Sequence, residues 1–266
     1  VWLLPQHPAI ARVTYSALAH RKAEVNVAVC QYLVEQHRFP ATVPLTADII
    51  DIDEHTAVTF WTYYPQPADV FPDSAHLGHL LRRLHALPRP PLDLPEWRAL
   101  ASLELVLRDT ARPIAIGDAD RRWLLDRIEQ VRHDLAELDW PLGYGLIHGD
   151  AWAGNLLWNT SSKTRTVVLG DWDSTCWGPR EIDLIPSWHA ATRYGRGPEW
   201  AAAFADAYGH DLTRWSGFYM VFAMRDLTQL VALLRRVPHQ PELAESLRQR
   251  LTGIKSGDTA AVWHAY

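Results

Sequence analysis

The sequence predicts an α+β protein with two lobes, a small one rich in strands followed by a larger one rich in helices. Up to residue 64, short runs of β-branched and aromatic residues surround a single helical stretch. Prolines between residues 65 and 73 then interrupt the pattern, and leucines at helical spacing follow. We therefore predict an N-terminal lobe at residues 1–64 and a C-terminal lobe at residues 65–266.

Two hairpins and one helix are expected in the N-terminal lobe. Turn-like residues separate the two strands of each hairpin. The helical stretch between the hairpins has one apolar face, formed by Val25, Val29, Tyr32 and Leu33. The predicted elements are strands at 2–4 and 9–15, a helix from Ala19 to between His37 and Pro40, and strands at 49–52 and 56–63.

The C-terminal lobe is expected to consist mainly of helices around two short strands. Ser74 is predicted to cap the first helix, and a second helix at 118–138 repeats its apolar stripe. The stripes contain Leu77, Leu80, Leu81 and Leu84 in the first helix and Leu124, Leu125, Ile128, Val131 and Leu135 in the second. Strands are predicted at 145–147 and 166–169, a helix from Pro198, and a long helix over 215–237.

Composition excludes several classes of protein. The chain of 266 residues has a net charge of −5, and no run of Lys or Arg exceeds two, so we expect no nucleic-acid partner. The apolar run at 215–224 ends after ten residues, about half of a bilayer span, and we expect no membrane span. The N-terminus has no signal-peptide pattern, so a cytoplasmic protein is predicted. Cys30 and Cys176 are interpreted as packing residues because they lack metal-site or disulfide spacing.

One stretch of the chain carries residues suited to chemistry. His148-Gly149-Asp150 follows the first C-lobe strand, and Asn155 comes five residues after the aspartate. Asp171 and Asp173 follow the second strand. Carboxylate and carboxamide oxygens on loops suit Mg²⁺, which also takes water and phosphate oxygens as ligands. The spacing therefore predicts a site for a metal ion and a phosphate.

The segments His148 to Asn155 and Val168 to Asp173 resemble the catalytic and metal-binding loops of aminoglycoside phosphotransferases and choline kinases. The resemblance covers roughly residues 2–230 and implies a protein-kinase-like fold with ATP bound between the lobes.

The same resemblance implies a role for each loop residue. Asp150 would be the catalytic base, and Asn155 and Asp171 would bind Mg²⁺. Asp173 would either coordinate metal indirectly or solvate its turn. His148 and Asp183 would be structural supports of the catalytic loop.

In the N-terminal lobe the resemblance is weaker. Arg12 occupies the position where kinase-like enzymes carry a phosphate-binding lysine, and Glu24 occupies the position of its helix partner, with Lys22 as a competing candidate. The turn that covers the phosphates has no counterpart, so we expect the first strand of the lobe to be missing. The predicted hinge, whose backbone would bond the adenine, consists of Phe60, Trp61, Thr62 and Tyr63.

The resemblance implies an ATP-dependent phosphotransferase acting on a hydroxyl of a small molecule. Residues 150–212 contain eight acidic and five basic side chains, which favours a cationic acceptor such as an aminoglycoside, an amino sugar or another antibiotic. Aromatic faces in the pocket would suit amines or sugar rings. The predicted acceptor pocket contains Trp188, Trp200, Trp215, Tyr219 and Asp226.

Two alternatives stay open. The first is a kinase-like module that binds nucleotide with weak or no transfer. The second is a metal-dependent phosphohydrolase built on His148, Asp150, Asp171 and Asp173.

Overall fold

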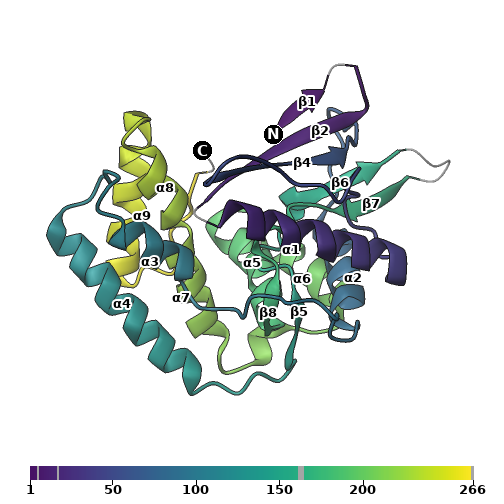
Figure 1. Cartoon of the computed structure of the whole chain (residues 1–266). Coiled ribbons are helices and arrows are strands. Elements are labelled where there is room, and N and C mark those ends of the chain that lie inside the picture. Colours follow the sequence, from purple (N-terminus) through teal and green to yellow (C-terminus); the bar gives the residue numbers. More distant parts are fainter. Residues whose placement is uncertain (5, 17, 161–164, 265–266) are drawn as a thin grey trace. The chain divides into compact units, whose positions relative to one another are not determined.

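Two hairpins form a four-stranded antiparallel sheet at the N-terminus, in the order β1-β2-β4-β3 (Figure 1). The computed structural model describes residues 1–4, 6–16, 18–160 and 165–264. The strands are β1 (Trp2–Leu4), β2 (Ala9–Tyr15), β3 (Ile50–Asp53) and β4 (Thr56–Thr62). The central strands β2 and β4 pair along their whole length, with Ala9 opposite Thr62 and Tyr15 opposite Thr56. Both predicted hairpins are confirmed.

Helix α1 (Ala19–Gln31) packs against β2 and β4 and continues as a π-helical turn, Tyr32–Gln36. Its buried side chains include Ala23, Asn26, Val27, Val29 and Cys30. The predicted apolar face is therefore only partly right: Val29 and Leu33 are buried, whereas Val25 and Tyr32 are half-buried. Alanines at the contact with the sheet let α1 lie close to the buried Ala57 of β4. The face of the helix that packs on the sheet therefore consists partly of small side chains.

Helix α2 (Ser74–His85) begins one residue earlier than predicted and is capped by Asp73, not by Ser74. The Asp73 carboxylate accepts from the His76 backbone N–H at 3.1 Å, and the His76 ring accepts from the Asp73 backbone N–H at 3.3 Å. This reciprocal pair is a capping box. Ser74 is the first helical residue and is buried. The four leucines of the predicted stripe are all buried, as expected.

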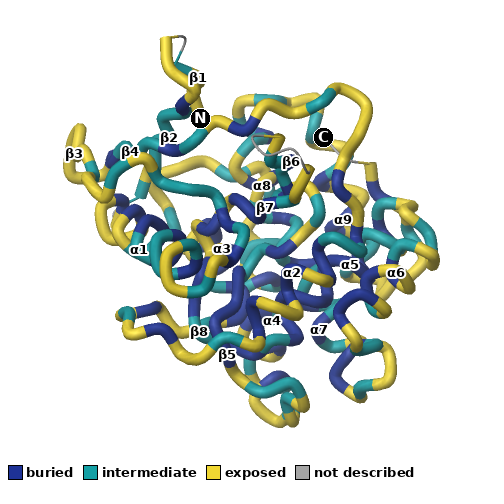
Figure 2. The backbone as a smooth tube through the Cα atoms, turned by 90° about the vertical axis from the view of Figure 1, so that its right-hand side faces the viewer, coloured by how far each residue is buried: buried dark blue, intermediate teal, exposed yellow. Residues whose placement is uncertain are grey.

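Two short antiparallel pairs of strands carry the predicted loops. Strand β5 (Tyr144–Ile147) pairs with β8 (Cys176–Pro179), and β6 (Leu156–Asn159) pairs with β7 (Thr166–Leu169). Figure 2 shows that β5 and β8 are mostly buried, whereas the edge strand β3 is exposed along its length. The loop that follows β5 is therefore anchored on a buried strand.

The described contacts divide the chain into two compact units. Unit 1 contains Val1–Trp97, Leu142–Asp183 and Ala203–His210, and unit 2 contains Arg98–Pro141, Leu184–Ala202 and Asp211–Tyr266. The sheet, α1, α2 and both strand pairs belong to unit 1. The lobe boundary at residues 64–65 stays a prediction.

Unit 2 is built from helices. They are α3 (Ala101–Arg108), α4 (Asp118–Ala136), α7 (Phe218–Thr228), α8 (Leu230–Arg236) and α9 (Ala244–Ser256), while α5 (Glu181–Arg193) and α6 (Pro198–Tyr208) each belong partly to both units. In α4 the predicted stripe is buried except for Leu125, which is half-buried. Within the described residues, no helix is long and apolar enough to cross a membrane.

The long helix predicted over residues 215–237 is wrong, because the chain breaks at Gln229 between α7 and α8. The Thr228 hydroxyl donates to the Arg225 carbonyl at 2.7 Å, and the Gln229 N–H bonds the carbonyls of Arg225 and Asp226 at 3.3 and 3.2 Å. A hydroxyl that competes for a helix carbonyl in this way disturbs the regular ladder.

We predict that Asp73→Ala lowers the free energy of unfolding by about 1 kcal/mol, because it removes the acceptor that caps α2. Chemical denaturation monitored by circular dichroism measures the change. Asp69→Ala, at an exposed position in the preceding segment, is the matched control and should change little. Equal stabilities of the two variants would contradict the capping role.

Candidate active site

The first predicted site segment leaves β5 and turns sharply at Gly149. Gly149 has φ +80°, and a Cβ atom added there would lie 2.2 Å from the carbonyl oxygen of Ser174. Only glycine fits so close an approach, and the turn delivers Asp150 directly after the buried strand. The chain then forms the 3₁₀ turn η2 (Ala153–Asn155), where Asn155 Nδ2 donates to the Asp150 carbonyl at 2.9 Å. Asp150 and Asn155 are thus held together on one loop.

Asp183, a predicted support, is completely buried beneath this loop. Its Oδ2 atom accepts from the backbone N–H of His148 at 2.7 Å, and its Oδ1 atom accepts from that of Gly149 at 2.8 Å. A buried carboxylate is stable only with such partners, and hydrogen bonds to a charged group are stronger than neutral ones. The two residues before Asp150 are therefore fixed by a side chain from the start of α5.

The second predicted segment follows β7 and contains an unusual backbone conformation. Asp171 has φ 63° and ψ 58°, in the left-handed region, which aspartate tolerates better than most residues but at a cost. The next residue begins the 3₁₀ turn η3 (Trp172–Ser174), and Trp172 is buried with Nε1 donating to the Leu169 carbonyl at 2.9 Å. The anchored indole leaves the Asp171 and Asp173 carboxylates partly exposed.

Hydrogen bonds join the two loops. The Gly170 N–H donates to the Asn155 carbonyl at 2.9 Å, and the His148 Nε2 atom lies 2.9 Å from the Gly170 carbonyl. Because a carbonyl only accepts, Nε2 of His148 carries the hydrogen. His148 is completely buried, so it lies within the packing behind the loops. Asn155 therefore links the two loops, through its side chain to Asp150 and through its carbonyl to Gly170, the residue before Asp171.

Arg12 of β2 reaches the second loop. Its Nη2 atom donates to the Asp171 carboxylate and, at 2.5 Å, to Asp173 Oδ2. Burial opposes a charged guanidinium, but Asp173 and Asp171 outweigh it and raise the pKa of Arg12 above its usual value. The buried Asn26 of α1 donates to Asp173 Oδ1 at 2.5 Å. Sequence reasoning missed Asn26, which reads as an ordinary polar residue in a helix.

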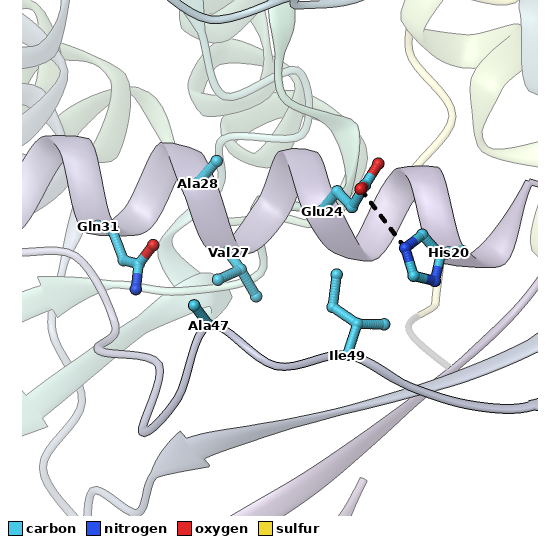
Figure 3. A pocket seen from close by; sticks show the side chains of 7 residues that line it. All are labelled: His20, Glu24, Val27, Ala28, Gln31, Ala47 and Ile49. Atoms are coloured by element: carbon cyan, nitrogen blue, oxygen red, sulfur yellow. Dashed lines mark ion pairs between the residues drawn. The ribbon is translucent and has the colours of Figure 1, made fainter.

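The structure does not bring Glu24 to Arg12, contrary to the sequence prediction. Glu24 lies on the exposed side of α1, where it pairs with His20 at 3.4 Å and Arg21 at 3.5 Å. Figure 3 shows Glu24 and His20 joined along the helix, beside a pocket of about 300 Å³. The helix instead turns Asn26 toward the site, and the competing candidate Lys22 is exposed.

The backbone groups of the predicted hinge residues are largely bonded to segments that flank the sheet. The Thr62 N–H bonds the Val43 carbonyl at 2.9 Å, and the Tyr63 N–H bonds the Pro8 carbonyl at 2.9 Å. The Phe60 carbonyl accepts from the Leu45 N–H at 2.9 Å, and Trp61 is buried with Nε1 donating to Thr59. The bonds to Val43 and Leu45 arise because the segment around Pro44 lies antiparallel to the end of β4, with Pro44 opposite Trp61.

A carboxamide just after the predicted hinge was missed from the sequence. Gln66 Nε2 donates to the carbonyls of Tyr64 at 2.8 Å and Trp158 at 3.1 Å. Gln66 Oε1 in turn accepts from the Trp158 N–H at 2.9 Å. The side chain thereby satisfies both backbone groups of a residue in β6, as a neighbouring strand would.

The oxygen donors of the two loops are of the chemical type that magnesium prefers. Asn155 uses its amide nitrogen on the Asp150 carbonyl, so its carboxamide oxygen is the atom suited to a cation. The Asp171 and Asp173 carboxylates are hard oxygen donors on the neighbouring loop, where Arg12 contacts both. Across the described residues, no group of three or more His, Cys, Asp or Glu side chains is arranged as a metal centre.

The predicted acceptor residues all lie in unit 2, where several have structural contacts. Trp188 is buried and meets the Phe218 ring edge to face, with centroids 6.4 Å apart. Trp215 Nε1 donates to the Asp139 carbonyl at 2.9 Å. By contrast, Trp200 carries the Arg196 guanidinium 5.2 Å above its ring, and Tyr219 is 79% exposed.

Asp226 differs from the expected acceptor carboxylate because it is buried in an ion pair. Arg193 donates to both of its oxygens, at 2.9 and 2.6 Å, and His189 Nε2 lies 2.9 Å from Oδ1. A carboxylate with these partners is already neutralised. The negative charge of Asp226, which we had expected to bind the acceptor, is therefore used in an ion pair inside unit 2.

Three comparisons place the chain among known proteins. The chain matches the phosphotransferase enzyme family over residues 17–218. A search among curated proteins found no match.

Solved structures of kinases share the fold. An amicoumacin kinase in complex with AMP-PNP, Ca²⁺ and Ami is 14% identical, with a TM-score of 0.68 over 96% of this chain and 84% of that one. A microcompartment-associated aminopropanol kinase is 18% identical, with a TM-score of 0.68 over 96% and 88%. A choline/ethanolamine kinase family protein from Mesorhizobium loti is 15% identical, with a TM-score of 0.60 over 94% and 82%. The predicted protein-kinase-like α+β fold is confirmed.

We predict that the free energy of unfolding falls between about pH 6.5 and pH 4 through His189. Burial and two nearby arginines lower the pKa of His189 to about 4, although its bond to Asp226 raises it. In this window the unfolded chain, with a histidine pKa of about 6.5, binds a proton that the folded chain does not. Stability is therefore full above pH 6.5 and is lost as the pH falls toward 4.

His189→Gln keeps an amide donor for Asp226 but cannot titrate, so its stability should depend less steeply on pH in this window. Urea denaturation at several pH values measures the slope. His133→Gln, at an exposed position of α4, is the control and should keep the wild-type slope. The same slope in both variants would show that His189 is not the titrating group.

Proposed function

Because the chain belongs to the phosphotransferase enzyme family, we propose that it transfers the γ-phosphate of ATP to a hydroxyl of a small molecule. The observation that carries this proposal is the junction of two loops. Asn155 bonds the Asp150 carbonyl through its side chain and the Gly170 N–H through its own carbonyl. The predicted base and both predicted metal ligands therefore share one hydrogen-bonded frame.

In the proposed reaction Asp150 orients the acceptor hydroxyl and takes its proton. The residue directly follows the fixed pair His148 and Gly149, so its backbone position is set before any substrate binds. Positioning of this kind supplies most of the catalysis in phosphoryl transfer, which requires little covalent chemistry from the protein.

Asn155 and Asp171 are the proposed magnesium ligands, with Asp173 beside them. A bound Mg²⁺ would neutralise charge on the phosphates. Arg12 contacts both Asp171 and Asp173 and is the proposed phosphate-binding residue, because a guanidinium bonds phosphate oxygens in pairs. Glu24 is not needed for this arrangement, since Asn26 supplies the contact from α1.

We place the adenine at the end of β4, next to the predicted hinge. Thr62 and Tyr63 use their N–H groups on Val43 and Pro8, so the adenine edge would bond backbone groups other than these two.

A small amine-bearing alcohol is the proposed acceptor. One structure with the same fold is named as an aminopropanol kinase, and another as a complex of GDP and kanamycin. In this chain Asp226 is occupied by Arg193 and the Trp200 ring carries Arg196, so the exposed ring of Tyr219 is the better candidate for acceptor contacts. The family match and the kinase folds do not favour the nucleotide-binding module or the phosphohydrolase.

We predict that Asp150→Asn lowers the rate of transfer about 10²- to 10⁴-fold, because the amide cannot accept the proton. Binding of ATP should change only a few-fold, since the side chain acts on the acceptor. ADP release with Mg-ATP is measured over a panel of aminoglycosides, other cationic antibiotics, amino sugars, choline and homoserine. Asp69→Asn is the matched control.

Acceptor-dependent ADP release that survives in Asp150→Asn would remove Asp150 from the role of base. ATP binding without ADP release from the wild-type protein across the panel would favour the nucleotide-binding module.

We further predict that Asp171→Asn weakens binding of Mg-ATP at least about tenfold, because it removes a charged ligand. Asparagine tolerates the left-handed conformation of this position, so the turn should persist. Calorimetry compares ATP binding with Mg²⁺ and with EDTA, and binding in EDTA should change little. Asp126→Asn, on the exposed side of α4, is the control. Equal losses in both conditions would mean that Asp171 is not a magnesium ligand.

A further inference from the structure

Three buried side chains form a hydrogen-bonded series behind the catalytic loop, and the proposed reaction gives no role to two of them. The Tyr208 hydroxyl at the end of α6 lies 2.9 Å from His85 Nδ1. His85 Nε2, at the end of α2, lies 3.1 Å from Asp183 Oδ2. All three residues are less than a tenth exposed.

The chemistry of the three groups sets the direction of the series. An ionised carboxylate only accepts, so the His85 Nε2 atom donates to Asp183. In a neutral imidazole the other nitrogen is then an acceptor, and the Tyr208 hydroxyl donates to it. Burial raises the pKa of Tyr208 above its usual range, which keeps the hydroxyl protonated. Asp183 thus determines which nitrogen of His85 carries the hydrogen, and His85 in turn makes the Tyr208 hydroxyl a donor.

The packing of α2 and α6 brings the pair together. A Cβ atom on Gly78 would lie 2.7 Å from the Phe204 carbonyl oxygen and 2.9 Å from the Ala207 Cβ atom. A glycine is needed where two helices approach so closely. Two turns further along α2, the His85 and Tyr208 rings meet edge to face, with centroids 5.6 Å apart.

His85 completes the coordination of the Asp183 carboxylate. Oδ1 accepts from the Gly149 N–H, and Oδ2 accepts from both the His148 N–H and His85. Donors to both oxygens fix the plane of the carboxylate, and this plane determines where the two backbone amides lie. A change at His85 should therefore reach Asp150 without any contact with substrate.

We propose that His85, oriented by Tyr208, is a positioning residue that holds Asp183 in the geometry needed to place Asp150. The inference rests on the proposed phosphotransferase function. It assigns the two residues no contact with ATP or with the acceptor. Its measurable consequence is that substitution of His85 or Tyr208 speeds amide hydrogen exchange at His148 and Gly149 and not across unit 1 as a whole.

The experiment compares three variants with the wild-type protein. His85→Leu removes the donor to Asp183, Tyr208→Phe removes only the hydroxyl, and His85→Gln restores one acceptor and one donor. Amide hydrogen exchange of the peptide containing His148 and Gly149 is measured, with the peptide of β7 as internal reference. His79→Leu, at an exposed position of the same helix, is the matched control.

We expect exchange at His148 and Gly149 to become about five- to tenfold faster in His85→Leu and Tyr208→Phe, and to return toward wild type in His85→Gln. The β7 peptide and the His79→Leu protein should be unchanged. In assays with an acceptor, kcat should be lower in His85→Leu and Tyr208→Phe than in the wild-type protein and should recover toward the wild-type value in His85→Gln. KM for ATP should stay within about twofold.

Wild-type exchange at the loop in both His85→Leu and Tyr208→Phe would overturn the proposal. Uniformly faster exchange over the whole of unit 1 would also overturn it, since it would mean general support of the fold. Selective loosening in a protein that transfers no phosphate to any acceptor would uphold the positioning role and reject the proposed function.

Discussion

The site depends on one buried charge. The Asp183 carboxylate lies in the interior of unit 1, where an ionised group without partners would be strongly destabilising. Its partners are the backbone amides of His148 and Gly149 and the ring of His85. The cost of burying the charge is thereby offset only when the loop takes one conformation. The same bonds that stabilise the carboxylate decide where Asp150 emerges.

A second electrostatic constraint shapes the face of α1. Asp171 and Asp173 lie close enough to share one guanidinium, so their negative charges would repel each other without Arg12. A further carboxylate from α1 would increase this repulsion, whereas the neutral Asn26 donates a hydrogen bond to Asp173. Glu24 lies two residues before Asn26 and therefore on the opposite side of α1, at the surface. The cation of β2 is balanced by the loop and not by the helix.

Local patterns predicted the fold well and pointed to the loops of the candidate site. The strands of both hairpins and the loop from His148 to Asn155 could be found because their signals lie within a few neighbouring residues. His85 could not be found, because its partners are 98 and 123 residues away along the chain. The break at Gln229 was missed for a related reason, since apolar residues on both sides preserve a helical pattern. The competing Thr228 hydroxyl leaves no mark in the periodicity.

The pairing of Gln66 with Trp158 has a mechanical consequence. The Gln66 carboxamide joins the segment after β4 to β6, which directly follows the catalytic loop, and the Trp158 indole adds a bond to the Val70 carbonyl. Both segments belong to unit 1, and these bonds connect them where no strand pairing does. Loss of the Gln66 carboxamide would leave the backbone N–H and carbonyl of Trp158 without these partners on the side of β6 that faces away from β7.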